Sequence, residues 1–310
     1  MKYFVIVILI LLTSCTNSIV NSNSAMNSGT PIYMDGNNTY YCKCNNYVYT
    51  LCSDKDGETV IKTLNPYEYI TSIFVKGDNI YYNVVDSETI SIMSDSVSGG
   101  ESKCIFSCKL PSNILKDDFI YVSEDTSVYY FIPQNALYKI TDNGGEEVLH
   151  EADDCVIANG TVYYALNGAI YSKQKGSKKE TKILTKEEIM ASKLNEKLID
   201  MLGDGYVNNM LIYNEKLYFL FTDWYSGGIF YVDTDGGNLN SLYENIRVNK
   251  FSFDENGDIY LLGNDIETQI KGLLKVMDDS VVLISDMELN GFYVNHGCYF
   301  YQHDKLLYKK

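Results

Sequence analysis

One repeated pattern constrains the fold of this chain more than any other feature. It consists of an aromatic strand, a short polar turn, a second strand, a turn rich in Asp, Gly and Ser, and a third apolar strand. Seven copies can be laid out, each marked by a tyrosine in its first strand, namely Tyr40, Tyr81, Tyr129, Tyr163, Tyr218, Tyr260 and Tyr299. Successive tyrosines are 41, 48, 34, 55, 42 and 39 residues apart, which is about 43 on average. The chain is therefore a repeat protein.

The repeat length and its residue types favour a β-propeller. About 43 residues make one four-stranded blade, whereas ankyrin and leucine-rich units are shorter. Most copies follow a further short strand, such as ITSIFVKG before the second copy, and Tyr, Ile, Val and Phe suit strands. We predict an all-β fold with four-stranded blades, seven favoured and six possible. An all-β sandwich, or two sandwiches, is the alternative.

A short helix interrupts the repeats near 185–202. Thr185 and Glu188 form a capping-box pattern, and apolar residues such as Met190 and Leu194 follow at helical spacing. The segment falls between the fourth and fifth copies, which explains the long interval there. At the ends of the chain, the last copy lacks a fourth strand, and we expect a strand near 31–34 to close the ring there or to begin the first blade.

The first residues of the chain, MKYFVIVILILLTSC, have the plan of a secretory signal: Lys2, an apolar run and small residues. Leu-Thr-Ser-Cys resembles the lipobox of bacterial lipoproteins, which implies a lipid on Cys15. We therefore expect a signal peptide at 1–14, a flexible polar tether at 15–30 and one propeller domain at 31–310. The alternatives are a cleaved signal with an incidental cysteine and an uncleaved membrane helix.

The fifth copy carries a more specific resemblance. Its stretch LFTDWYSGGIFYVDTDGGN resembles the YWTD repeat of low-density-lipoprotein-receptor-type propellers. Phe221, Thr222 and Asp223 match Trp-Thr-Asp, and 235–238 matches the outer turn. The whole chain is similar to divergent relatives in lipoproteins and surface proteins of Gram-positive bacteria, whose function is mostly uncharacterised. YWTD propellers are six-bladed, whereas seven copies are counted here, and the resemblance implies no catalytic residues.

The charge of the chain argues against a nucleic-acid partner. The formal net charge is −16 and Arg247 is the one arginine, so there is no basic stripe to neutralise phosphates. Nucleophile-elbow, dinucleotide and Walker patterns are also absent from the sequence. We predict no cofactor and no catalytic residues.

The cysteines are expected to be free thiols. Without Cys15, seven of the eight remain, an odd number. A hairpin turn at Asn45-Asn46 is expected to place Cys44 opposite Tyr47, away from any other cysteine. Cys-x-Cys has no second Cys/His pair at zinc-type spacing, so no metal site is predicted either.

Propeller topology locates the candidate site. Turns between the second and third strands share a face with the connections between blades, so the helical insertion should meet Trp224 and Tyr225. An exposed aromatic pair beside an amphipathic helix is a plausible binding patch, and the alternative is a helix that only covers Trp224. Asp265, Glu267 and His303 should lie on the same face.

The predicted function is binding. We expect a lipid-anchored propeller on the extracytoplasmic face of a bacterial membrane that binds or scaffolds a protein, peptide or glycan. The alternative is a glycan-acting hydrolase that uses carboxylates at the mouth of the central channel.

Overall fold

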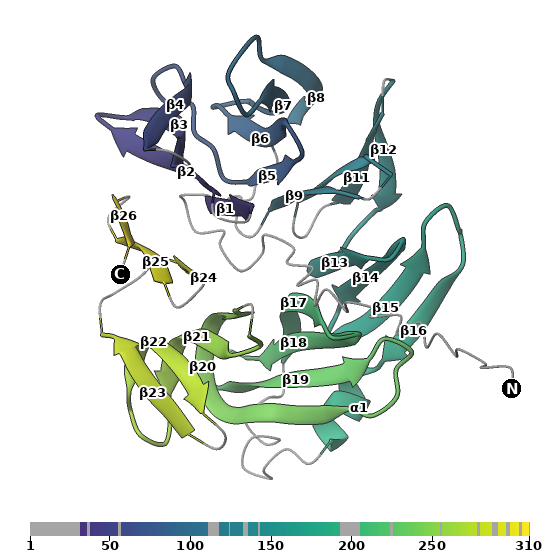
Figure 1. Cartoon of the computed structure of the whole chain (residues 1–310). Helices are drawn as coiled ribbons and strands as arrows, with labels where there is room; N and C mark the ends of the chain where they lie inside the picture. Colours follow the sequence, from purple (N-terminus) through teal and green to yellow (C-terminus); the bar gives the residue numbers. More distant parts are fainter. Residues whose placement is uncertain are drawn as a thin grey trace, which may run out of the picture.

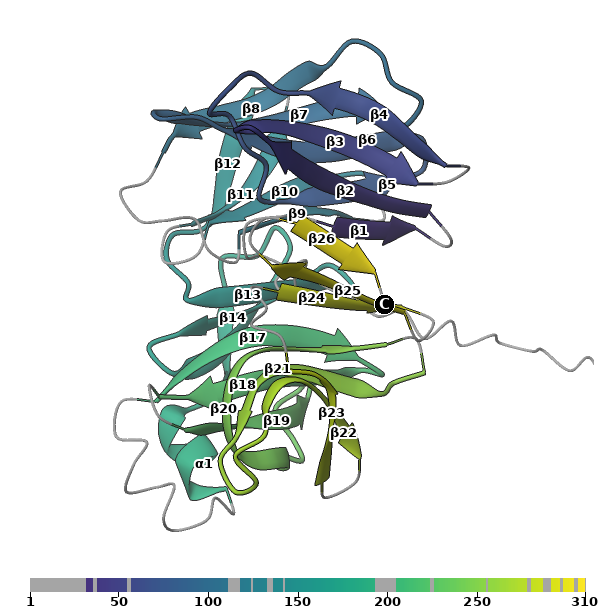
Figure 2. The same cartoon turned by 90° about the vertical axis from the view of Figure 1, so that its left-hand side faces the viewer.

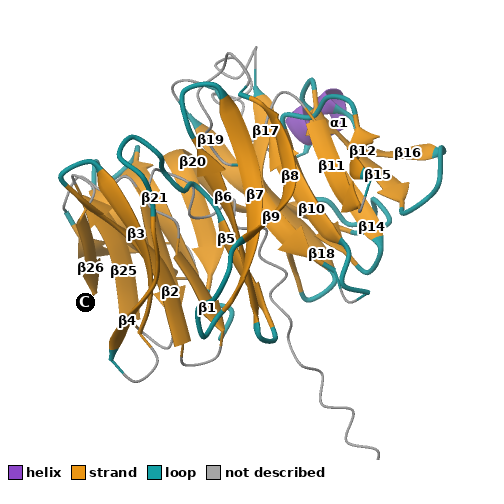
Figure 3. Ribbon diagram, turned by 90° about the horizontal axis from the view of Figure 1, so that it is seen from above, coloured by secondary structure: helices purple, strands orange, loops and turns teal. Residues whose placement is uncertain are grey.

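The protein is a β-propeller. The computed structural model describes residues 32–35, 38–54, 57–110, 118–123, 125–132, 136–141, 143–192, 205–223, 226–254, 256–277, 280–286, 291–295, 298–303 and 306–309. Their strands form six antiparallel sheets arranged around a common centre (Figure 1). Strands dominate the described residues and one short helix accompanies them (Figure 3). The all-β prediction with four-stranded blades is confirmed.

Each of the first four sheets contains four strands that are consecutive in the sequence, which we label A to D from the centre outwards. The first two sheets are β1 (Ile32–Asp35), β2 (Asn38–Asn45), β3 (Val48–Asp54) and β4 (Glu58–Thr63), then β5 (Ile73–Lys76), β6 (Asn79–Val85), β7 (Thr89–Ser96) and β8 (Lys103–Lys109). The next two are β9 (Phe119–Val122), β10 (Val128–Ile132), β11 (Ala136–Thr141) and β12 (Gly144–Leu149), then β13 (Asp154–Ala158), β14 (Thr161–Leu166), β15 (Ala169–Gln174) and β16 (Glu180–Leu184).

The fifth sheet has seven strands and covers two of the expected repeats. Its strands are β17 (Tyr206–Tyr213), β18 (Lys216–Thr222), β19 (Gly227–Asp233), β20 (Asn240–Phe253), β21 (Ile259–Asp265), β22 (Lys271–Met277) and β23 (Ser280–Ser285). The first half of β20 pairs with β19 and the second half with β21, and Ile246 is aligned with residues of both. One strand thus serves as strand D of one repeat and strand A of the next.

The last sheet has three strands, β24 (Gly291–Asn295), β25 (Cys298–His303) and β26 (Leu306–Lys309). β24 contacts β20 and β21, and β26 contacts β2, so this sheet lies between the seven-stranded sheet and the first sheet (Figure 2). β1 pairs with β2 and therefore begins the first sheet, which was one of the two expected alternatives. The number of blades stays a prediction, because the sheets do not divide into seven sets of four.

A β-bulge with an aliphatic side chain recurs in strand D. In each case the pairing with strand C skips one residue of strand D. The skipped residues are Ile61, Ile105, Val148, Ile183, Leu242 and Ile284, and all six pack, partly buried, against the core. A bulge bends and twists its strand. The periodic bulge therefore gives the outer strands a common twist while its side chain fills the space between sheets.

Hydrogen bonds also connect neighbouring repeats near the centre of the ring. Ser72 Oγ accepts from Ile120 N at 2.8 Å, Asp154 Oδ2 from Met210 N at 2.8 Å, and Asn209 Oδ1 from Phe251 N at 2.7 Å. Acceptor and donor are 48, 56 and 42 residues apart, so each bond spans about one repeat. The first two bonds cross from one sheet to another, and the third joins two repeats of the seven-stranded sheet. All three satisfy buried amide groups.

A buried polar cluster strengthens the junction between the second and third sheets. Asp118 Oδ2 accepts hydrogen bonds from Thr71 Oγ1 at 2.8 Å, Asn83 Nδ2 at 2.9 Å and Tyr130 OH at 2.8 Å. Asn83 Oδ1 accepts in turn from the amides of Thr71 and Ser72, both at 2.9 Å. Burial and the neighbouring Asp118 carboxylate raise the pKa of Tyr130, which keeps its hydroxyl a donor.

The predicted capping box is confirmed in the helix α1 (Lys186–Ala191). Thr185 Oγ1 accepts from Glu188 N at 3.1 Å, and Glu188 Oε2 accepts from Thr185 N at 2.8 Å. Ile189 is fully buried in a cluster that joins the β13–β16 sheet to β17 and β18. The rest of the predicted insertion lies outside the described residues. Among the residues that are described, no helix is long and apolar enough to cross a membrane.

Ser72→Ala tests the cross-sheet hydrogen bonds. The variant leaves the buried Ile120 amide without its side-chain acceptor, so we expect the free energy of unfolding to fall by about 1–3 kcal/mol. Urea unfolding followed by circular dichroism measures the change. Ser252→Ala is the matched control, because Ser252 is equally buried in an innermost strand but its hydroxyl donates only to Phe253 O, at 3.4 Å. Equal losses in both variants would contradict a role for the cross-sheet bond.

Candidate functional site

The structure divides the turns between two faces of the ring. We call the side that carries the turns from strand B to strand C, and the connections from strand D to the next sheet, the BC face. Asp265 ends β21, Glu267 lies in the turn that follows it, and His303 ends β25, so all three positions are on the BC face. Trp224 and Tyr225 lie outside the described residues. The BC-face location of Asp265, Glu267 and His303 agrees with the prediction, and their role as ligand-binding residues stays a prediction.

The Asp265 carboxylate builds its own turn. Its Oδ1 atom accepts from Thr268 N at 2.7 Å and from Thr268 Oγ1 at 3.0 Å, while Oδ2 accepts from the Tyr243 hydroxyl. The residue is 2% exposed. Burial would raise the pKa of Asp265, but the hydrogen bonds outweigh it and the net effect lowers the pKa. Asp265 is therefore an ionised, fully engaged structural group.

The same turn occurs in two other repeats. Asp86 accepts from Thr89 N at 2.7 Å and from Thr89 Oγ1 at 2.8 Å, and Asp223 Oδ1 accepts from Ser226 N at 2.8 Å. Each aspartate follows the repeat tyrosine by five positions, as Asp265 follows Tyr260. Asp-x-x-Ser/Thr was therefore a sequence signal for the BC turns that the pattern analysis missed.

The YWTD-like pair is part of this turn. Thr222 Oγ1 donates to Asp223 O at 2.8 Å and lies 2.9 Å from Ser226 O, and its side chain is 4% exposed. Asp223 N also donates to Ser226 O at 2.9 Å. The Thr-Asp pair thus fixes the direction in which the chain leaves β18. The resemblance to the YWTD repeat therefore rests on residues that shape a turn.

A second aromatic group occupies the BC face in the first sheet. The turn between β2 and β3 is formed by Asn46 and Tyr47, one residue later than expected, and Cys44 pairs with Tyr49. The expected turn at Asn45-Asn46 was wrong because Tyr47 adopts a left-handed conformation, with φ of 65°. Tyrosine seldom adopts that conformation, so this turn could not be predicted from the residue types.

Tyr47 stacks on Tyr67 from the connection between the first two sheets. Their ring centroids are 6.2 Å apart, their planes differ by 28°, and Tyr67 N donates to Tyr47 O at 3.3 Å. The two residues are 67% and 79% exposed, and within the described part of the chain their hydroxyls have no hydrogen-bond partner. Tyr67 is also left-handed, with φ of 71°. Both exposed aromatic rings therefore belong to residues whose backbone is strained.

Tyr49 and Tyr69 extend this group towards the core. Their ring centroids are 6.3 Å apart, and Tyr69 forms an isolated β-bridge with Val85 of the second sheet. Burial, together with the nearby Cys44 thiol, raises the pKa of Tyr49 to about 12. We call Tyr47, Tyr49, Tyr67 and Tyr69 the tyrosine patch. Its inner pair anchors its exposed outer pair to two sheets.

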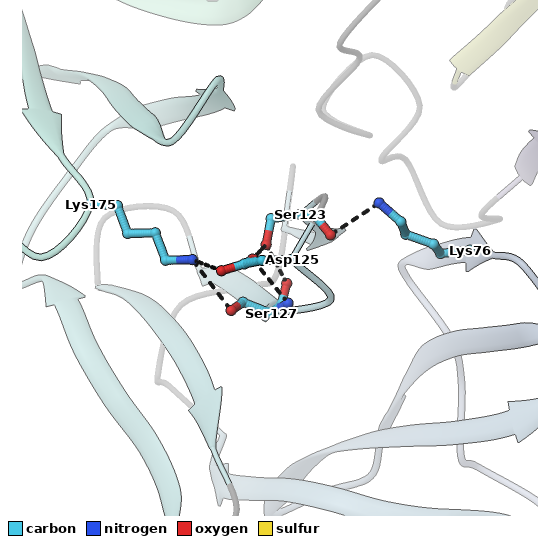
Figure 4. A network of polar contacts seen from close by, with 5 residues as sticks. All are labelled: Lys76, Ser123, Asp125, Ser127 and Lys175. Atoms are coloured by element: carbon cyan, nitrogen blue, oxygen red, sulfur yellow. Dashed lines mark hydrogen bonds and ion pairs between the residues drawn. The ribbon is translucent and has the colours of Figure 1, made fainter.

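The opposite face carries a polar network that connects three sheets (Figure 4). Lys76 Nζ donates to Ser123 O at 3.0 Å, Ser123 Oγ donates to Asp125, and Lys175 forms an ion pair with Asp125. The Lys175 ammonium and the serine hydrogen bonds hold the pKa of Asp125 well below its usual range. Because these groups satisfy one another's hydrogen bonds and charges, the network is a surface contact that joins the turns of neighbouring sheets.

Six cysteines are free thiols, namely Cys42, Cys44, Cys52, Cys104, Cys108 and Cys155. This agrees with the expectation of free thiols. Within the same residues, no group of three or more His, Cys, Asp or Glu side chains could hold a metal ion.

Asp265→Asn tests the turn assignment. A lowered folded-state pKa means that the carboxylate contributes stability above its unfolded pKa of about 4, and that this contribution is lost on acidification. We expect unfolding midpoints in urea to fall less between about pH 7 and about pH 3 in Asp265→Asn than in the parent protein. Glu215→Gln, at an exposed turn position, should keep the acid sensitivity of the parent. An unchanged pH profile in Asp265→Asn would refute the assignment.

No protein-family model matches the chain, and no curated protein matches it. Solved structures do. A prolyl endopeptidase has a TM-score of 0.61 at 10% identity over 93% of this chain and 49% of its own, so this chain spans about half its length. The extracellular domain of the putative one component system BT4673 from B. thetaiotaomicron gives 0.60 at 11% identity over 95% of this chain and 39% of its own. YCF48 bound to a D1 peptide gives 0.56 at 11% identity over 89% and 90%. At such identities these likenesses show the fold, which is that of a β-propeller.

Proposed function

We propose that this protein is a lipid-anchored, extracytoplasmic β-propeller that binds or scaffolds a protein, peptide or glycan through its BC face. The observation that carries the proposal is the exposed, stacked pair of Tyr47 and Tyr67. A left-handed non-glycine residue costs conformational free energy, and this conformation persists only where the surrounding structure holds it. Such strained residues cluster at functional sites. The sequence predicts a second aromatic pair, Trp224 and Tyr225, on the same face.

Tyrosine pairs are well suited to recognition. Each ring offers a large apolar surface with a polar tip, and few side-chain torsions must be fixed on binding. The inner residues Tyr49 and Tyr69 already anchor the patch, which reduces the ordering cost further. The net charge of −16 favours neutral or cationic ligands over anionic ones such as nucleic acid.

One solved neighbour supports the peptide class. One solved structure is of YCF48 bound to a D1 peptide, and the likeness covers 89% of this chain and 90% of that one. The likeness is one of fold, so the ligand is that protein's own. It supports the proposal only by showing that a peptide can occupy such a scaffold.

The alternative, a glycan-acting hydrolase, needs two carboxylates free to act as acid and as base or nucleophile. Asp86 and Asp265 instead commit their oxygen atoms to their own turns. We therefore favour binding over hydrolysis.

The membrane anchor and the family belong to the same proposal. The Leu-Thr-Ser-Cys pattern supports lipidation of Cys15, and the polar residues 16–30 would hold the propeller a short distance from the membrane. The turn around Thr222 and Asp223 supports kinship with divergent YWTD-like propellers of bacterial surface lipoproteins.

Tyr47→Asn/Tyr67→Asn tests the binding face. Asparagine tolerates left-handed backbone, so the turns should persist while the aromatic surface disappears. We expect a cell-surface partner captured by the parent protein to bind about tenfold more weakly or worse. Affinity capture from surface extract, followed by titration of the captured partner, measures this.

Two further variants complete this test. Val60→Asn is the control, because Val60 is 56% exposed on the outer strand β4, and it should bind as the parent does. Trp224→Ala/Tyr225→Ala reports whether the predicted aromatic pair takes part. If all three variants capture every partner equally well, the proposed face is wrong.

Metabolic labelling with a palmitate analogue tests the anchor. The parent chain should be labelled, and Cys15→Ala should lose the label and leave the membrane fraction. Cys104→Ala should keep it, although Cys104 is an exposed free thiol. Persistent labelling of Cys15→Ala would exclude the proposed anchor.

A further inference from the structure

The outermost strand β23 differs from the other outer strands of the propeller. Its sequence, SVVLIS, has no charged residue and four consecutive apolar ones. Val282 is 49% exposed and Leu283 43%, and Met277, at the end of β22, is 46% exposed. Among the described residues, these three belong to a short set of large hydrophobic side chains exposed to this degree.

The other strands that end a described sheet at its outer edge all carry charge. β4 contains Glu58 and Lys62, β8 has Lys103 and Lys109, β12 has Glu146 and Glu147, β16 has Glu180 and Lys182, and β26 has Lys309. Charges on an edge strand discourage pairing with another chain. β23 lacks that protection.

Among the described strands, none pairs with the outer edge of β23. This strand ends the seven-stranded sheet and lies at the outer rim of the ring, far from the centre (Figure 1). Alternate residues of a strand that pairs on one side direct their N–H and C=O groups away from that side. Val281 and Ile284 pack against the core, which holds the strand in place while Val282 and Leu283 face outwards.

We propose that β23 is a docking edge for an extended, basic segment of a protein partner, which adds to the sheet as one more strand. Main-chain hydrogen bonds would supply affinity. Val282 and Leu283 are consecutive and point to opposite faces of the sheet, so β-branched side chains on both faces of the added strand would cover them. This edge is separate from the tyrosine patch. The inference therefore stands or falls independently of the BC face.

Charge decides the kind of partner. Residues 278–288 contain four acidic and no basic side chains, and Asp286, directly after β23, is exposed. The chain as a whole has 41 acidic and 25 basic residues. Lysine or arginine on both sides of an apolar core in the partner would complement these charges and speed association.

The same charges disfavour a second copy of this chain. In antiparallel self-pairing centred between Val282 and Leu283, position 279 faces position 286, and both are aspartates. Like charges directly opposite one another destabilise a strand pair. Two molecules of net charge −16 also repel each other before contact.

The test uses the full chain in mild detergent and a fluorescein-labelled peptide in which three valines alternate with two threonines between pairs of lysines. Fluorescence anisotropy should show saturable binding to the parent protein. Replacing the central valine with proline removes a ladder donor, and replacing the lysines with glutamates reverses the charge. Each change in the peptide should weaken binding about tenfold or more, and equal binding of all three peptides would overturn the proposal.

The protein variant is Val282→Lys/Leu283→Lys, which introduces the charges that other edges carry. Because both side chains are exposed, the fold should persist, and thermal unfolding checks this. Thr59→Lys/Val60→Lys makes the same change on the edge strand β4, where both residues are exposed. We expect at least about tenfold weaker binding for the β23 variant and unchanged binding for the β4 variant.

Two outcomes would overturn the proposal. Equal effects of the two variants would show that net charge alone governs peptide binding. A concentration-dependent dimer of the parent chain in analytical ultracentrifugation, abolished by Val282→Lys/Leu283→Lys, would show that the edge pairs with a second copy.

Discussion

The hydrogen bonds between the innermost strands hold the ring in register. Apolar packing between sheets supplies most of the favourable free energy but is not directional, whereas a side-chain acceptor opposite a buried amide allows one alignment. Ser72, Asp154 and Asn209 provide such acceptors, each to an amide about one repeat later in the chain. The bulged aliphatic residues in strand D then complete the packing at larger radius. The hydrogen bonds thus fix the alignment of the strands at the centre of the ring, and the bulged apolar side chains fill the space between sheets at the rim.

This division leaves the turns of the BC face free to differ. Three of them use the same Asp-x-x-Ser/Thr turn, whereas the first sheet has the left-handed tyrosine turn. A rigid scaffold with variable loops is a common way to place recognition residues. The proposed binding face follows from that arrangement, because among the described BC turns the one with exposed aromatic rings also has strained tyrosine backbone.

The sequence predicted the strands better than the turns. The seven repeat tyrosines all lie in strand B of their units, because alternating aromatic and β-branched residues favour strands through local, repeated preferences. The left-handed turn at Asn46 and Tyr47 could not be predicted, since tyrosine has no preference for it and the contact with Tyr67 that accompanies it is distant in sequence. Asp265 was correctly placed on its face, but its hydrogen-bond partners become visible only when Tyr243 and Thr268 are beside it. The repeat pattern suggested separate strands in this region. β20 is instead one continuous strand, because no glycine or proline interrupts residues 240–253.

That continuous strand has a consequence for how the molecule opens. In the first four sheets, strand D of one sheet and strand A of the next are separate strands, so one sheet can fray while its neighbour stays paired. β20 hydrogen-bonds to β19 along its first half and to β21 along its second. The sheet units on either side of Ile246 therefore form one cooperative unit, in the sense of subglobal unfolding. The two repeats that share β20 therefore cannot separate without disrupting a strand that belongs to both.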